Sequence, residues 1–468
     1  MAEITWKSIL TKLVGGDHLS AEESEWFVDD LMNGNADPAA VGAVLATQQQ
    51  LGLTPDEVRG AAKAMVAHAI PLYIDGETTD IVGTGGDGAS TVNLSSMGAV
   101  VAAAAGVKVV KHGNRAASSK CGTADCFEAL GLPMDLTPEQ VSEVGNGCGI
   151  AFAFARTFHP AMRFVGPIRA ALGVPCVFNV LGPLTNPASP KHMAVGCANR
   201  KMSPIMAAVY AANGQIGMVY TSHEGLDEMA PTGPVSIWEF KDGKVTENKF
   251  DPTVELGLAK VTIADLKGGE PTLNAQLARD FFAGKDVSFR TTALLNAASA
   301  IVADGHLVPG DASLADRFKA AYAIAEQTVD SGKATATSGS PPPKLRRKPE
   351  NADNVCVCEG PGVNMNRTPI VGLKKFRFDD RRCGSFVCVR IEGDVTTTGS
   401  GARRWSSSSP EPARTRSPEG LPYRCIPRET GSGCTGPTAR RRSWEAAAAD
   451  ATTGRRRSPR RATTSRTV

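Results

Sequence analysis

The sequence predicts an α/β protein with a small N-terminal helical domain, a larger domain around a mainly parallel central sheet, and a disordered C-terminal extension. Three observations support this prediction. Apolar residues recur at helical spacing through the first 72 residues, strand-like and helix-like segments alternate from residue 79, and the composition changes beyond Lys333. We therefore place the domains at residues 1–75, 76–334 and 335–468.

The net charge of +3 conceals two parts of opposite sign. Residues 335–468 hold 26 Lys+Arg and 12 Asp+Glu, whereas residues 1–334 hold 25 and 36. We interpret the chain as an acidic globular body with a basic tail. Because the tail is rich in Arg, Ser, Thr and Pro and poor in aliphatic residues, we expect a disordered extension or an out-of-frame reading.

The N-terminus has an early acidic residue and lacks the apolar segment of a signal peptide. No apolar run is long enough to span a bilayer, so we expect a cytoplasmic protein without a membrane partner. The five cysteines of the body have neither metal-site nor secreted-protein spacing, and we expect free thiols. The tail pairs Cys356/Cys358 and Cys383/Cys388 are too irregular for a zinc site.

Helical signals dominate residues 1–72. Ser20 and Glu23 form a capping box, and Asn33-Gly34-Asn35 ends the helix that follows. Two further helices are expected at residues 39–51 and 55–69.

The larger domain begins where short apolar strands appear. The expected strands are at residues 80–82, 107–110, 174–180, 193–197 and 216–220. A hairpin is expected at residues 235–245, with Asp242-Gly243 as its turn. The expected helices are at residues 95–105, 294–303 and 312–331.

A glycine loop, GTGGDG at residues 83–88, follows the first strand. Its spacing fits the dinucleotide fingerprint, which is weak by itself and requires an acidic residue after the next strand. That place holds KHGNR at residues 111–115, and no Lys-Ser/Thr follows the glycines as in a P-loop. A cationic segment beside a glycine loop indicates a ligand with several phosphates.

Polar residues follow both strands of this predicted site. Thr91, Asn93, Ser95 and Ser96 at a helix start either bind phosphate or merely cap the helix. The polar segment at residues 111–120 is either an anion cradle or a solvated face, and its position at the carboxyl edge of the sheet favours the cradle.

Residues 222–228, SHEGLDE, follow a predicted strand and place two carboxylates side by side. Such a pair is either a solvated acidic loop or a site for a hard cation such as Mg²⁺. His223 has no partner at zinc spacing. Arg169, in an otherwise apolar helix, either clamps a carboxylate or is a surface side chain.

Five segments in order resemble the anthranilate phosphoribosyltransferase family: residues 83–88, 91–95, 111–115, 178–187 (FNVLGPLTNP) and 225–228. The resemblance covers about residues 5–334. It implies transfer of the 5-phosphoribosyl group from phosphoribosyl pyrophosphate (PRPP) to anthranilate, Mg²⁺ as cofactor, and a homodimer. It also implies a helical domain that is completed in space by a segment near residues 165–190.

The resemblance also assigns the site. The residues implied to bind PRPP are Gly83, Gly86, Asp87, Thr91, Asn93, Leu94, Ser95, Ser96, Lys111, His112, Gly113, Asn114, Arg115, Ala116, Ala117, Ser118, Ser119 and Thr123. Those implied to hold anthranilate are Gly83, Asn114 and Arg169, and those implied to hold Mg²⁺ are Ser95, Asp227 and Glu228. Lys111 and Asp87 are the expected catalytic residues.

The sequence departs from the family pattern in three places. Thr123 and Cys121 stand where the family usually has Ser, and residues 222–225 carry one glycine fewer than usual. Two other functions stay open at this point. One is an enzyme like the pyrimidine nucleoside phosphorylases, although its loop signature is missing. The other is a catalytically silent relative that binds nucleic acid through the basic tail.

Overall fold

The computed structural model describes residues 3–116, 119–338, 376–383 and 386–391. The chain divides into two units, Met1–Pro349 and Glu350–Val468. In the second unit the described residues form an antiparallel pair of strands, β8 (Phe376–Cys383) and β9 (Phe386–Ile391), which the composition did not predict. The rest of the tail, including Cys356 and Cys358, lies outside the described residues. The expected disorder of the tail and its possible binding of nucleic acid concern those same residues.

Four helices form the N-terminal bundle: α1 (Trp6–Val14), α2 (Ala21–Met32), α3 (Pro38–Leu51) and α4 (Pro55–Ala67). Capping boxes start three of them, including the expected one from Ser20 to Glu23. Glu57 is fully buried and accepts hydrogen bonds from the backbone N–H groups of Leu19 and Thr54. This single carboxylate therefore fastens the start of α4 to the start of α2.

The larger domain contains a seven-stranded sheet of order β3-β2-β1-β4-β5-β6-β7. Its strands are β1 (Thr79–Gly83), β2 (Val109–Gly113), β3 (Ile150–Phe154), β4 (His192–Gly196), β5 (Ile216–Thr221), β6 (Val235–Lys241) and β7 (Lys244–Phe250). The first five are parallel, and β6 and β7 form the expected hairpin, in which Asp242 and Gly243 both have positive φ. The predicted fold class, a mainly parallel sheet beside a helical domain, is confirmed.

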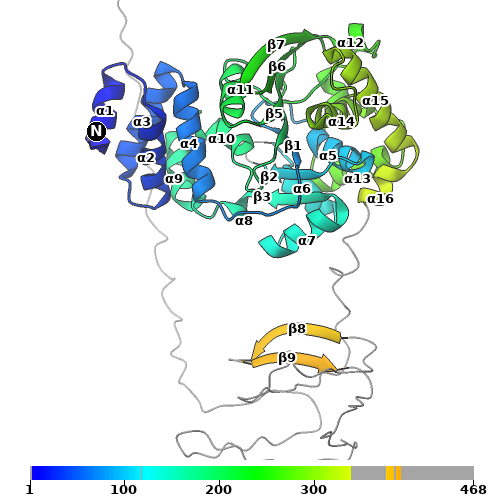
Figure 1. Ribbon diagram of the computed structural model, residues 1–468, viewed down its shortest axis with the longest axis horizontal. Coiled ribbons are helices and arrows are strands. Elements are labelled where there is room, and N and C mark those ends of the chain that lie inside the picture. The colour runs from blue at the N-terminus through cyan, green and yellow to red at the C-terminus, as the bar shows by residue number, and fades with distance from the viewer. Residues whose placement is uncertain (1–2, 117–118, 339–375, 384–385, 392–468) are drawn as a thin grey trace, which may run out of the picture. The chain divides into compact units, whose positions relative to one another are not determined.

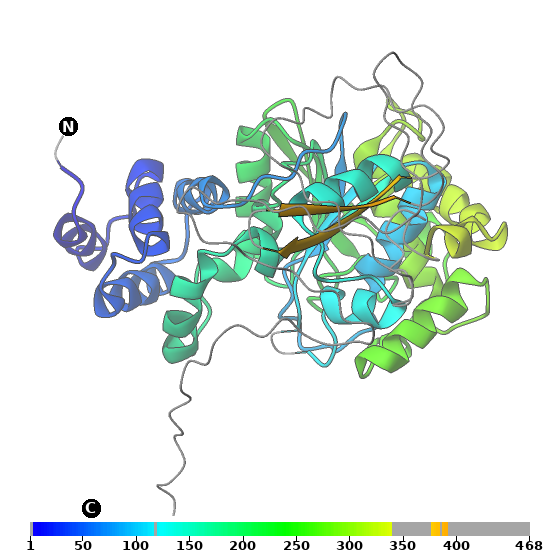
Figure 2. The same ribbon diagram turned by 90° about the horizontal axis from the view of Figure 1, so that it is seen from below.

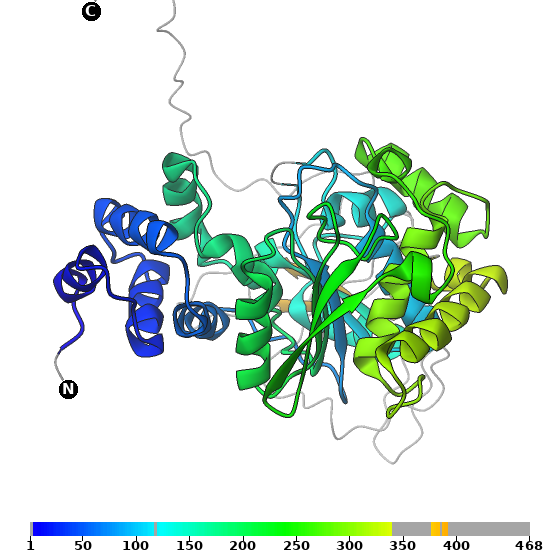
Figure 3. The ribbon, with the colours of Figure 1, turned by 90° about the horizontal axis from the view of Figure 1, so that it is seen from above.

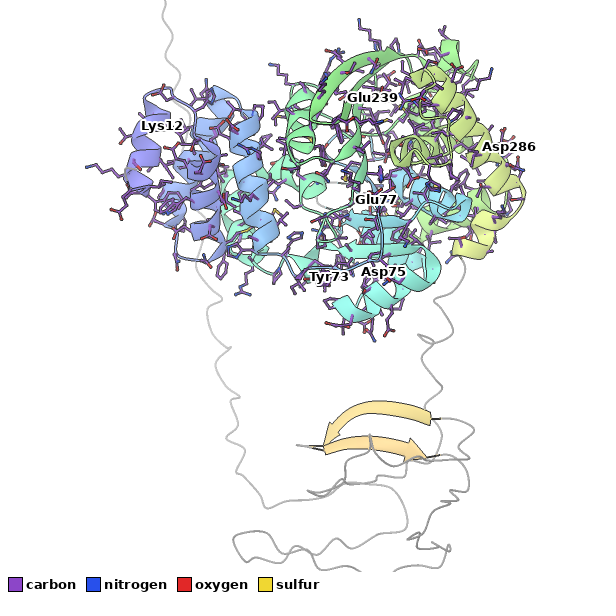
Figure 4. All side chains as sticks on the ribbon, viewed as in Figure 1. Lys12, Tyr73, Asp75, Glu77, Glu239 and Asp286 are labelled. Atoms are coloured by element: carbon purple, nitrogen blue, oxygen red, sulfur yellow. The ribbon has the colours of Figure 1, made fainter. Side chains whose placement is uncertain are left out.

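Helices cover both faces of this sheet (Figures 1 and 3). The remaining helices of the first unit are α5 (Leu94–Ala105), α6 (Thr123–Leu130), α7 (Pro138–Cys148), α8 (Ala155–Phe158), α9 (Met162–Leu172), α10 (Phe178–Leu184), α11 (Ser203–Ala212), α12 (Pro252–Glu255), η1 (Ile263–Leu266), α13 (Pro271–Phe282), α14 (Arg290–Asp304), α15 (Leu314–Asp330) and α16 (Lys333–Ser338). Helices α5 and α14 pack on β1, whereas α11 packs on β5 and β6 from the side of the helical bundle. Glu239, which is labelled in Figure 4, lies on β6. It accepts a hydrogen bond of 2.7 Å from Arg317 of α15, which joins the outer helices to the hairpin.

The strand predicted at residues 174–180 is wrong, because α10 begins at Phe178 within that segment. A short apolar run bounded by prolines does not distinguish a buried strand from a buried helix. Helix α9 contacts α2 and α3, and α10 contacts α4, so both lie against the N-terminal bundle (Figures 1 and 2). Val165 and Phe178 belong to the same buried apolar cluster as the bundle.

Among the described residues, no helix combines the length and the apolar character that a membrane crossing requires.

Candidate functional site

A broad cleft runs along the carboxyl ends of the parallel strands, between the sheet and the helical segments around α3, α4 and α9. It collects residues that lie far apart in the sequence. The predicted site residues that line it are Gly83, Gly86, Asp87, Thr91, Asn93, Ser95, Lys111, His112, Gly113, Asn114, Arg115, Ala116, Ser119, Thr123, Arg169, Asp227 and Glu228. Leu94 and Ser96 are buried and do not line the cleft, whereas Ala117 and Ser118 lie outside the described residues.

Asp227 approaches the glycine loop directly. Its Oδ2 accepts a hydrogen bond of 2.6 Å from the backbone N–H of Gly85. A Cβ added at Gly83 would lie 2.2 Å from this same oxygen, and one added at Gly196 would lie 1.7 Å from the Asp227 carbonyl oxygen. Gly83 and Gly196 therefore leave the space in which the acidic segment reaches the end of β1.

Three carboxylates gather at this point: Asp87, Asp227 and Glu228. Burial raises the pKa of Asp227 to about 7, with a further contribution from the charge of Asp87 beside it. Burial, and then the charge of Asp227, also raises the pKa of Glu228 well above its ordinary value. Asp227 and Glu228 thus form a buried acidic pair rather than the solvated loop that the sequence left open as an alternative.

The acidic pair is fixed from behind by Asn296 of α14, which is fully buried. Its Oδ1 accepts from the backbone N–H of Met229 at 3.1 Å, and its Nδ2 donates to the carbonyl oxygen of Met229 at 3.1 Å. Ser222 adds a hydrogen bond of 2.6 Å to the carbonyl oxygen of Glu228. The two carboxylates therefore project from a rigid backbone. Sequence reasoning missed Asn296, because a polar residue in an apolar helix gives no sign of its partner.

The sequence predicts a polar loop that begins at Lys111, but the structure places this residue inside a strand. Strand β2 continues to Gly113, and the Lys111 side chain is 1% exposed. Its Nζ donates to the carbonyl oxygen of Ile81 at 2.6 Å and to Ser95 Oγ at 3.3 Å. Burial lowers the pKa of Lys111, and the charges of Asp80, Glu228 and Asp227 oppose that shift. Lys111 is therefore a buried cation behind the site.

Asp80 is a second element that sequence reasoning missed, because one acid in a short apolar strand carries no functional signal. It is fully buried, and burial raises its pKa to about 6. It accepts from the backbone N–H of His112 at 3.2 Å and from Asn186 Nδ2 at 2.8 Å. Asn186 belongs to the segment after α10, so this carboxylate links β1, β2 and the α10 segment.

His112 is likewise enclosed rather than free to bind an anion with its ring. Its Nδ1 pairs with the carbonyl oxygen of Gly182 at 2.9 Å, and its ring packs against His159 with centroids 5.2 Å apart. Burial lowers the pKa of His112 to about 3 and that of His159 to about 4. Both rings are therefore neutral at physiological pH and carry no charge that would attract an anion. Among the described residues of the expected cradle, 111–116 and 119 line the cleft, and Lys111 and His112 are buried there.

Arg115 is engaged by two acids of helix α6. It donates to Asp125 at 2.8 Å and to Glu128 at 2.7 Å, while Asp125 also accepts from the backbone N–H groups of Ala116 and Gly122. The Arg115 side chain is 40% exposed. Asp125 thus shapes the loop that enters the cleft.

Asn93 stands at the start of α5 but makes no side-chain cap hydrogen bond. Its Nδ2 donates instead to the carbonyl oxygen of Cys121 at 3.2 Å. Mere capping therefore does not explain this residue. The backbone N–H of Ser95 donates to Glu228 at 3.3 Å, so the same helix start also faces the acidic pair.

The donor set fits a divalent metal ion. Glu228 Oε2 and Asp87 Oδ2 are buried and have no hydrogen-bond partner among the described residues. A buried carboxylate is stabilised by binding either a proton or a cation, and hard oxygen ligands favour Mg²⁺. Within the described part of the chain, no group of three or more His, Cys, Asp and Glu residues is arranged to hold a metal by itself. Hydroxyl, substrate or water oxygens would have to complete such a site.

Two family models match the chain. A glycosyl transferase family helical bundle domain matches residues 7–69, and a glycosyl transferase family a/b domain matches residues 75–335. Among curated proteins, the anthranilate phosphoribosyltransferase of Arthrobacter sp. (strain FB24) is 46% identical over 332 residues, which is 71% of this chain and 94% of that protein. The one from Saccharopolyspora erythraea is 48% identical over 299 residues, 64% of this chain and 85% of that protein.

Solved structures give the same result. The anthranilate phosphoribosyltransferase of Thermus thermophilus has a TM-score of 0.65 and 38% identity, and the match covers 70% of this chain and 97% of that one. The Saccharomyces cerevisiae enzyme in complex with PRPP and Mg has a TM-score of 0.64 and 27% identity, and covers 72% and 96%.

Proposed function

The chain belongs to the anthranilate phosphoribosyltransferase family of glycosyltransferases, and we propose that it transfers the 5-phosphoribosyl group of PRPP to anthranilate with release of pyrophosphate. The observation that carries this proposal is the meeting, in one cleft, of the glycine loop, the start of α5 and the buried acidic pair. A glycine loop and a helix start offer backbone N–H groups to phosphates.

The chain's own residues support the reaction by positioning and by charge. Backbone N–H groups of the glycine loop and of the start of α5 receive the diphosphate, and Asp87, beside them, is placed to accept hydrogen bonds from ribose hydroxyls. Lys111 supplies a buried positive charge that opposes the negative charge growing on the leaving group. Arg169, in the wall of the cleft, is placed to hold the anthranilate carboxylate. The aromatic amine attacks C1 of the ribose without prior loss of a proton, so no general base is assigned.

Ser95, Asp227 and Glu228 would hold Mg²⁺, which neutralises the diphosphate oxygens when bound. The yeast relative was solved in complex with PRPP and Mg.

The decisive assay follows the loss of anthranilate fluorescence when PRPP and Mg²⁺ are added to the purified full chain and to residues 1–338. Turnover by both proteins is the expected result. Phosphorolysis of thymidine, with no reaction between PRPP and anthranilate, would contradict the proposal and favour a nucleoside phosphorylase.

Replacement of Arg169 by alanine is expected to raise the anthranilate KM about tenfold or more and to leave the PRPP KM nearly unchanged. The reason is that a guanidinium binds a carboxylate through two parallel hydrogen bonds. Arg169→Lys keeps the charge but loses this geometry. Its anthranilate KM should lie between those of the wild type and Arg169→Ala. Steady-state kinetics with each substrate varied in turn measures the effect, and wild-type anthranilate kinetics in Arg169→Ala would show that the assignment is wrong.

Replacement of Asp87 by alanine is expected to act on the other substrate. It removes the carboxylate beside Asp227 and the Asx hydrogen bond of 2.9 Å to the backbone N–H of Ala89. We expect the PRPP KM to rise about tenfold to a hundredfold, with the anthranilate KM changed little. Isothermal titration with PRPP and Mg²⁺ provides a check without turnover. Equal PRPP affinities for the two proteins would refute the role of Asp87.

A homodimer and a cytoplasmic location complete the proposal. The homodimer rests on the family resemblance. The location rests on the spacing of the five cysteines of the globular body, which is neither that of a metal site nor that of a secreted disulfide framework. Light scattering on residues 1–338 measures the oligomeric state directly.

A further inference from the structure

Asn274 of α13 lies outside every motif that identified the site. Its side chain is 1% exposed in a helix whose other buried residues are apolar. Burial of an amide in such surroundings is costly unless its hydrogen-bonding groups are satisfied. The amide of Asn274 forms hydrogen bonds with two groups outside α13. These two partners indicate which segments the residue holds in place.

The first partner lies in the cleft wall. Asn274 Nδ2 donates to Asn93 Oδ1 at 2.9 Å. Asn93 uses its other amide group, Nδ2, to donate to the carbonyl oxygen of Cys121 at 3.2 Å, and the Cys121 thiol donates back to Asn93 Oδ1 at 3.3 Å. The orientation of the Asn93 amide is therefore set from both ends, and it joins the start of α5 to the loop that enters α6.

The second partner belongs to the segment before α13. Asn274 Oδ1 accepts from the backbone N–H of Gly269 at 2.8 Å. This segment lies along the residues between the glycine loop and α5: Gly268 donates to the carbonyl oxygen of Ser90 at 3.0 Å, and Thr91 and Lys267 form a β-bridge. The Asn274 side chain therefore holds both the segment of residues 266–269 and the Asn93 amide by hydrogen bonds.

We propose that Asn274 is a positioning residue for the phosphoribosyl donor, acting through Asn93 to hold the start of α5 and the Cys121 loop in register. The inference rests on the proposed function, because the donor contacts of Asn93 come from it. Asn274 itself does not line the cleft.

The sharpest test is Asn274→Asp, which preserves size and the bond to Gly269 but replaces the Nδ2 donor with an acceptor. An acceptor facing Asn93 Oδ1 forces the Asn93 amide to turn, and the turned amide loses its bond to the Cys121 carbonyl oxygen. We expect the PRPP KM to rise about tenfold, the anthranilate KM to stay within about twofold, and PRPP affinity measured by titration to fall in parallel. The matched control is Gln276→Ala, an exposed residue on the same helix that should leave all three values unchanged.

A double-mutant cycle separates positioning from mere stabilisation. If Asn274 acts through Asn93, then Asn274→Asp should add little to the PRPP KM in an Asn93→Ala background. A lower melting temperature and a lower active fraction, with unchanged PRPP KM and affinity, would overturn the inference. Should Asn274→Asp not fold, Asn274→Ser, which is smaller and uncharged, is used in the same cycle. Lack of any PRPP-dependent turnover in the wild-type protein would refute the proposed function instead.

Discussion

Replacement of Asp227 by asparagine is expected to reduce kcat at least a hundredfold and to remove the response to Mg²⁺. The variant keeps an oxygen for the Gly85 N–H bond of 2.6 Å, so the backbone of the loop should be preserved. What it loses is half of the charge that the acidic pair presents to a cation, and electrostatic groups of this kind contribute about 3 kcal/mol to the barrier. Glu228→Gln should behave in the same way.

The same substitution should stabilise the metal-free protein above neutral pH. The pKa of Asp227 is raised to about 7 in the folded state, from an ordinary value of 3.8. The folded protein therefore binds more protons than the unfolded chain between these values, so the metal-free wild type loses stability as the pH rises through that window. Asparagine does not titrate. The difference in melting temperature should accordingly favour Asp227→Asn at pH 8 and shrink as the pH falls towards 4.

Glu224→Gln is the matched control, because Glu224 is exposed and belongs to the same loop. It should retain wild-type turnover, Mg²⁺ dependence and pH profile. Calorimetry of all three proteins with and without Mg²⁺ and pyrophosphate gives the comparison. An Asp227→Asn enzyme that still gains stability from Mg²⁺ with pyrophosphate would show that the cation binds elsewhere.

The sequence was sufficient for the main plan of this site because of a topological rule. Residues 83–88, 91–96 and 227–228 each follow a buried parallel strand, and the carboxyl ends of parallel strands meet at one edge of a sheet. The helical bundle could be predicted for a similar local reason, since its capping boxes are contained within four residues.

What could not be predicted depends on tertiary contacts. The sequence around Lys111 and His112 is typical of a solvated or anion-binding segment. Both residues are buried because β2 pairs with β3 as far as Gly113, and that pairing is a tertiary contact. Asn296 and Asn274 lie on helices far along the chain, and each is meaningful only through the loop that it holds. The segment at residues 174–180 was assigned to a strand because periodicity over seven residues does not separate the two structures.

Lys111→Met is expected to have the largest effect on stability. Methionine fills a similar volume but leaves Asp80, Asp227 and Glu228 buried without the cation between them. Removal of one partner from a buried charged network costs about 3 to 5 kcal/mol. We expect the melting temperature at pH 8 to fall by at least about 5 °C, together with a loss of kcat of about a hundredfold.

The pH dependence of this loss identifies its cause. Carboxylates deprived of Lys111 can avoid the burial of unpaired charge only by binding protons, so their pKa values should rise further and the deficit in stability should shrink as the pH falls from 8 to 5. Lys108→Met, in the segment that leads into the same strand, replaces a lysine whose Nζ bonds a backbone carbonyl oxygen and should show no such trend. A stability deficit in Lys111→Met that is small at pH 8 and independent of pH would mean that the buried amine carries no charge. In that case the stabilisation of the leaving group would have to come from the bound cation and the backbone N–H groups of the glycine loop alone.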